Sequence, residues 1–131
     1  MRWVGVLVAF VLFGLVWSSA GLAATEVPTV TNLTATPSTF CAKKSSGCSH
    51  PGTRLTFKIS TNATVLCDIL PRFKNTYGYF EFEKKFQKGT NSVRLNDSRL
   101  KPGGWRIRVQ ARNNVGAGPI AIKDVRVVKH H

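Results

Sequence analysis

The chain has 131 residues, of which 19 are lysine or arginine and only 6 are aspartate or glutamate, giving a formal net charge of +13. This length fits one domain of ordinary size, and the charge favours acidic partners. The acidic residues are scattered along the sequence, and only Glu81 and Glu83 are expected to share a strand face. Without converging titratable groups, a phosphate loop or a metal-ligand cluster, we expect neither an enzyme nor a bound cofactor.

The first 24 residues have the layout of a secretory signal peptide. Arg2 precedes an uncharged apolar run from Trp3 to Trp17, and small residues follow as far as Ala24. The run is shorter than the about 20 residues of a membrane-spanning helix, which favours cleavage after Ala23 or Ala24 over a retained anchor. We therefore expect a protein that is secreted or held at the cell envelope, with no transmembrane span after cleavage. Without Arg2, the chain from residue 25 onward carries 18 basic and 6 acidic residues, a net charge of +12.

After residue 25 the sequence alternates between short β-strand patterns and turn residues, without a helical period. The predicted strands span residues 25–36, 54–60, 64–70, 79–86, 92–95, 104–111 and 120–128. Seven short strands predict an all-β, antiparallel sandwich over residues 25–131. Alternation within these strands predicts the core residues Leu55, Phe57, Ile59, Val65, Cys67, Ile69, Phe80, Phe82, Phe86, Val93, Leu95, Trp105, Ile107, Val109 and Ala111.

The three cysteines divide into a pair and a single residue. Cys41 and Cys48 flank a short polar segment, and in a secreted chain they are expected to form a disulfide worth about 2–3 kcal/mol. A metal site is the alternative, but His50 is the only further ligand nearby. Cys67 lies on the strand face of Val65 and is expected to be a buried thiol. An intermolecular disulfide and a catalytic thiol are the alternatives for Cys67.

The segment from Leu100 to Pro119 resembles the last two strands of fibronectin type III domains, with Trp105 in the place of their usual tyrosine. The start of the domain, from Val30 to Ala35, resembles their first strand, whereas Phe57 stands where a tryptophan is usual. Nearly all of the chain after residue 24 is also similar to small secreted immunoglobulin-like domains of the kind common in actinobacteria. The matching features are Pro37, Phe40-Cys41, Cys48, Pro51-Gly52-Thr53, Asn62-Ala63-Thr64-Val65, Gly89-Thr90-Asn91 and Leu100-Lys101-Pro102-Gly103. The resemblance implies a seven-stranded immunoglobulin/fibronectin III-like sandwich that acts as an extracellular interaction module.

A basic sheet face is the first candidate for a binding site. Arg106 and Arg108 point outward from one predicted strand, and the topology implied by the resemblance adds basic residues from neighbouring strands. The expected face consists of Arg72, Lys84, Arg106, Arg108, Arg112, Lys123 and Arg126. Such a face would attract an anionic polysaccharide or another acidic polymer; a merely solvated face is the alternative. The chain lacks a recognition helix and an aromatic RNA-binding signature, so we expect no sequence-specific binding to nucleic acid.

The aromatic turn from Phe73 to Tyr79 is the second candidate, for contacts with an extracellular protein or a sugar. Packing of these rings in the core or at a sheet edge is the alternative. An adhesin or inhibitor-like module that acts through loops or a sheet edge is the second functional hypothesis, and we expect a monomer. Asn32, Asn62 and Asn96 begin glycosylation sequons, which would be occupied only in a eukaryotic secretory pathway.

Overall fold

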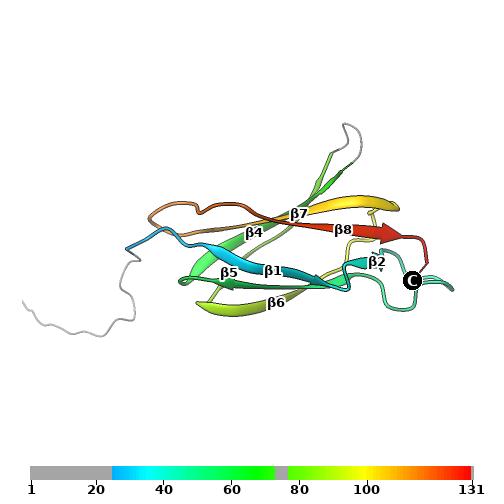
Figure 1. The fold of residues 1–131 in the computed structure, drawn as a ribbon, viewed down its shortest axis with the longest axis horizontal. Helices are drawn as coiled ribbons and strands as arrows, with labels where there is room; N and C mark the ends of the chain where they lie inside the picture. The colour runs from blue at the N-terminus through cyan, green and yellow to red at the C-terminus, as the bar shows by residue number, and fades with distance from the viewer. Residues whose placement is uncertain (1–24, 73–76, 131) are drawn as a thin grey trace, which may run out of the picture.

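The computed structural model describes residues 25–72 and 77–130 (Figure 1). The expected signal peptide lies outside the described residues, as do residues 73–76 of the aromatic turn. The described ranges form strands, turns and loops, and they hold no helix that is long and apolar enough to cross a membrane.

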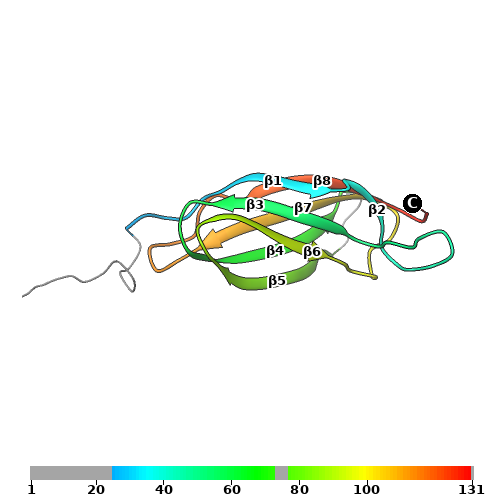
Figure 2. The same ribbon diagram turned by 90° about the horizontal axis from the view of Figure 1, so that it is seen from below.

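Two β-sheets pack face to face (Figures 1 and 2). One sheet has the strand order β1-β3-β6 and the other has the order β2-β8-β7-β4-β5. The expected all-β, two-sheet sandwich is confirmed, but the expectation of seven antiparallel strands is wrong, since eight strands form and β2 runs parallel to β8. The strands are β1 (Val30–Thr36), β2 (Thr39–Cys41), β3 (Thr53–Ile59), β4 (Ala63–Pro71), β5 (Tyr79–Phe86), β6 (Gly89–Leu95), β7 (Gly103–Arg112) and β8 (Ala121–Val128).

The additional strand β2 forms where the chain passes from one sheet to the other. Pro37 ends the pairing of β1 with β3, because proline has no N–H to donate to a strand ladder. The Ser38 carbonyl then accepts a hydrogen bond from the Arg126 N–H at 2.9 Å, and β2 continues alongside β8. Phe40 is buried by this pairing. A strand of three residues is too short to show alternation, so the sequence pattern gives no sign of it.

The core lies between the two sheets and contains the alternating residues that the sequence predicts, apart from Phe80. Phe57 on β3 is fully buried, and its ring meets that of Phe86 edge to face at 5.4 Å. Phe80 is 61% exposed, so its predicted core position is wrong. The reason is a bulge in β5: Phe80 pairs with Asp68 and Phe82 with Cys67, which places one extra residue in this strand and reverses its alternation.

The predicted Cys41–Cys48 disulfide is present and closes the loop between β2 and β3. Gly52 follows this loop with φ +92°, a conformation that glycine adopts at little cost. Its N–H donates to the Cys41 carbonyl at 2.8 Å, which ties the loop to the start of β3. Cys67 is a free, buried cysteine, as its position on the strand face of Val65 predicts.

Candidate functional site

The expected basic face corresponds to the outer side of the five-stranded sheet. Strands β4, β5, β7 and β8 are adjacent in this sheet, as the interpretation requires. Five of the seven expected residues lie on its outer side or at its end: Arg72, Arg106, Arg108, Arg112 and Arg126.

Lys84 and Lys123 do not belong to this face. Lys123 is in register with the buried Ile107, and Lys84 is in register with the buried Val65. Side chains along a strand alternate between the two faces, and Lys123 and Arg126 are an odd number of residues apart. They therefore point to opposite faces, and this part of the prediction is wrong.

Acidic residues neutralise most of the arginines on the outer side of the five-stranded sheet. The Arg108 guanidinium donates two hydrogen bonds, of 2.9 and 2.6 Å, to the Asp68 carboxylate. Arg106 and Arg72 both approach Asp124, at 3.0 and 3.6 Å. The remaining pair joins Arg112 to Glu83.

Within the described ranges, Arg126 is the member of this group without an ion pair. The hydrogen bond from Arg106 lowers the pKa of Asp124, so this carboxylate keeps its charge to lower pH and continues to offset the arginines beside it. The face is consequently much less positive than its five arginines suggest.

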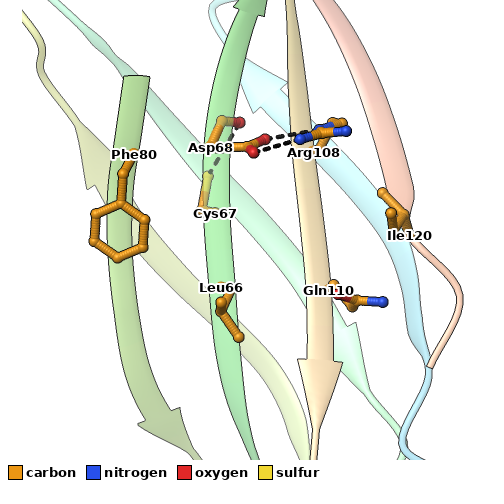
Figure 3. A pocket seen from close by; sticks show the side chains of 7 residues that line it. All are labelled: Leu66, Cys67, Asp68, Phe80, Arg108, Gln110 and Ile120. Carbon is orange, nitrogen blue, oxygen red and sulfur yellow. Dashed lines mark hydrogen bonds and ion pairs between the residues drawn. The ribbon is translucent and has the colours of Figure 1, made fainter. Parts of the chain in front are cut away.

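Apolar side chains occupy the middle of the same face (Figure 3). A hollow of about 120 Å³ is lined by Leu66, Cys67, Asp68, Phe80, Arg108, Gln110 and Ile120. Figure 3 shows the Asp68–Arg108 pair between Phe80 on one side and Ile120 on the other. Phe80, Ile120 and Ile122 are 61%, 48% and 53% exposed. Burial raises the pKa of the Cys67 thiol, which leaves it protonated and a poor nucleophile.

Three basic residues without acidic partners among the described residues lie on the other sheet, on strands β3 and β6. On the outer side of β1-β3-β6, Arg54 lies in register with Arg94 on one side and with Thr36 on the other. The next outward position on β3 is Thr56, whose hydroxyl lies 3.1 Å from that of Ser92. The outward residues of this sheet include Thr31, Thr34, Thr36, Arg54, Thr56, Lys58, Thr90, Ser92 and Arg94.

This surface, the hydroxyl-arginine face, carries no negative charge. All six acidic residues of the chain are among the described residues, and none is an outward residue of β1, β3 or β6. Arg54, Lys58 and Arg94 make no ion pair with any described residue. Arg94 donates a hydrogen bond of 2.6 Å to the Pro51 carbonyl, which holds its guanidinium near the start of β3. Alternation within residues 54–60 predicts that Arg54 and Lys58 point outward. It does not predict that Arg94, 40 positions farther along the chain, lies beside Arg54.

Glu81 and Glu83 lie in different surroundings, contrary to the prediction that they share a strand face. The bulge turns Glu81 toward Asp97 in the loop between β6 and β7, while Glu83 pairs with Arg112. Asp97 is nearly buried and accepts two hydrogen bonds, at 2.9 and 2.8 Å, from the Arg99 guanidinium.

Glu81 keeps a proton because of this environment. Burial and the neighbouring Asp97 raise the pKa of Glu81 to about 8, whereas the hydrogen bonds from Arg99 hold the pKa of Asp97 far below its usual range. No donor among the described residues reaches the buried Oε2 of Glu81. The two carboxyl groups lie within hydrogen-bonding reach of each other, so a protonated Glu81 can donate to the Asp97 carboxylate.

Aromatic rings complete this cluster at the start of β5. The Arg99 guanidinium lies 4.1 Å from the centre of the Tyr79 ring, which stacks on Trp105 at 6.1 Å. These contacts stabilise the position of the loop between β6 and β7 against the sandwich. In the described ranges, histidine, cysteine and acidic side chains do not form a group of three or more that could hold a metal ion.

We compared the chain with protein-family models, with curated protein sequences and with solved structures, and none of the three comparisons found a match.

Proposed function

We propose that this protein is a non-catalytic, secreted or cell-surface module that binds anionic polymers through the hydroxyl-arginine face. The observation that carries this proposal is the register of Arg54 with Arg94, on a face without an acidic residue. Like charges directly opposite each other destabilise a sheet. A bound polyanion would relieve that repulsion, whereas four of the five arginines on the outer side of the five-stranded sheet already have carboxylate partners.

The spacing of the cations suits an extended ligand better than a single small anion. Neighbouring strands lie about 4.8 Å apart, and alternate residues of a strand are about 6.8 Å apart. Arg54 and Arg94 therefore form one cationic row, and Lys58 lies about 13–14 Å farther along β3. Hydroxyls of Thr56 and Ser92 occupy the row between them and can donate to the oxygens of a sugar, sulfate or phosphate.

The test is a binding assay with three defined polyanions: dextran sulfate, polygalacturonate and double-stranded DNA. The variant Arg54→Gln/Arg94→Gln is compared with Arg106→Gln/Arg108→Gln, which loses the same amount of charge from the other sheet. We expect the first variant to lose at least about tenfold in affinity and to show a shallower dependence on salt. Equal losses in both variants would indicate a non-specific charge effect and would overturn the assignment to this face.

Binding to an extracellular protein is the second candidate function. Phe80 and Ile122 are exposed in the middle of a face whose charges largely cancel, and such a mixed surface suits an apolar contact. Contacts of that kind persist at high salt, unlike those of a polyanion. Capture of a defined partner that survives high salt and is lost in Phe80→Ser would favour this function.

We further propose that the sandwich is of the immunoglobulin/fibronectin III type, in a secreted protein of the bacterial kind described above. The strand order supports this assignment, because β3 lies between β1 and β6 in one sheet while β7 lies between β4 and β8 in the other. A net charge of +12 after residue 24 makes copies of the chain repel each other, which supports a monomer.

A further inference from the structure

We propose that a pocket at the disulfide end of the sandwich binds a small amphiphilic anion, a molecule with one carboxylate or phosphate group and an apolar tail. This inference is independent of the proposed polymer binding, since the pocket and the hydroxyl-arginine face share no residue. We call this site the end pocket.

Three separate segments build the end pocket. They are the disulfide loop after β2, the loop before β7 and the end of β8, and all three lie at the end of the molecule that holds the chain terminus labelled C (Figures 1 and 2). The pocket has a volume of about 310 Å³, which is at the lower end of the range for small-molecule sites. Its lining consists of Ala42, Lys43, Lys44, Ser45, Leu100, Pro102, Val128 and Lys129.

The lining separates into an apolar floor and a basic rim. Ala42 and Leu100 are only 6% and 4% exposed, and Pro102 and Val128 extend the same apolar surface. Exposed lysines of the disulfide loop and of the end of β8 supply the rim. This combination fits a ligand that has both an apolar tail and a negative group.

The charge of the rim is uncompensated within the described residues. No acidic side chain lines the pocket, and Lys43, Lys44 and Lys129 make no ion pair there. The nearest acidic residue along the chain, Asp97, is engaged by Arg99. Three ammonium groups around an apolar floor therefore favour an anionic headgroup over a neutral or cationic one.

Contacts within the protein hold the three segments of the pocket in place, and the end of β8 is fixed by the pairing of Val128 with Cys41 on β2. The Cys41–Cys48 disulfide and two 3.0 Å backbone hydrogen bonds between Ser45 and Cys48 fix the loop that carries the rim lysines. The Trp105 indole N–H donates to the Lys101 carbonyl at 2.8 Å and fixes the loop before β7. A site formed in advance in this way loses little entropy when the ligand binds.

Isothermal titration calorimetry with alkyl phosphates below their micelle concentrations tests the proposal. We expect octyl phosphate to bind, inorganic phosphate to bind too weakly to measure, and the uncharged octyl glucoside to bind more weakly than octyl phosphate. Each methylene added between hexyl and octyl phosphate should strengthen binding by up to about fourfold. Affinity that is independent of chain length, or equal for inorganic phosphate, would overturn the proposal.

Variants separate the two parts of the site. Lys44→Gln/Lys129→Gln should weaken octyl phosphate binding at least about fivefold, and Val128→Thr should reduce the gain per methylene. Lys88→Gln, in the turn between β5 and β6 and outside the pocket, is the charge control and should bind like the unchanged protein. An equal loss in the control would refute a local site.

The source of the ligand is distinguished by competition. Vesicles of an equimolar mixture of phosphatidylcholine and phosphatidylglycerol should displace octyl phosphate if the natural ligand is a membrane lipid, and should not if it is a free amphiphile. The variant Arg54→Gln/Arg94→Gln should keep full affinity for octyl phosphate. A failure of the end pocket is thus distinguishable from a failure of the proposed polymer binding.

Discussion

Replacing Glu81 with glutamine should stabilise the protein at neutral and alkaline pH, and much less at acidic pH. Burial and the nearby Asp97 raise the pKa of Glu81 from 4.5 to about 8 in the folded protein. The folded state therefore keeps a proton that the unfolded chain releases, and the free energy of unfolding falls as the pH rises from about 4.5 to about 8. Glutamine does not titrate, and its amide N–H can still donate to Asp97.

The size of the effect follows from the shift in pKa and the exposure of the side chain. One pKa unit corresponds to about 1.4 kcal/mol, which makes the full shift an upper limit. Glu81 is only partly buried, so solvent screens the interaction, and we expect a gain of about 1–2 kcal/mol near pH 9. The gain should shrink toward zero near pH 4, where both states of Glu81 are protonated.

Urea unfolding at several pH values measures this effect directly. Glu26→Gln, at an exposed position before β1, is the control for the loss of a surface carboxylate. A stability difference that is the same at every pH, or a Glu81→Gln protein that is less stable at alkaline pH, would show that Glu81 is charged in the folded state. Either result would refute the hydrogen-bonded carboxyl pair.

Two further predictions concern packing and the central ion pair. Alanine at Gly118 would place its Cβ against the Pro28 carbonyl, so we expect a loss of about 1–3 kcal/mol in thermal unfolding. Gly116→Ala, whose Cβ meets a side chain only at the ordinary distance of 3.6 Å, should change stability by less than about 0.5 kcal/mol. A double-mutant cycle on Asp68 and Arg108 should give a coupling below about 1 kcal/mol that weakens with salt, because both side chains are partly exposed. A coupling above about 2 kcal/mol would contradict this account.

Local sequence patterns predicted much of the fold. Alternation in residues 104–111 identifies Trp105 and Ile107 as inward-facing and Arg106 and Arg108 as outward-facing, because side-chain direction in a strand depends only on position along it. The same rule fails at β5. There the bulge inserts one residue, and the local composition does not predict where the register of β5 with β4 shifts.

Candidate sites were harder to predict, because their character depends on which strands become neighbours. The outward arginines of β7 suggest a cationic surface until β4, β5 and β8 bring Asp68, Glu83 and Asp124 beside them. Conversely, Arg54 and Arg94 become neighbours only because β3 pairs with β6. The net charge of a sheet face therefore depends on side chains from several strands, and the pattern within one strand does not predict it.

By itself the sequence determined the all-β class, most of the strand positions, the Cys41–Cys48 bridge and the excess of basic residues. Each of these depends on composition or on neighbours within a few residues. The tertiary structure decided which basic residues are neutralised, where Phe80 points and how three distant segments enclose the end pocket. Those outcomes depend on strand register and on contacts between residues far apart in the chain, which alternation within one strand does not encode.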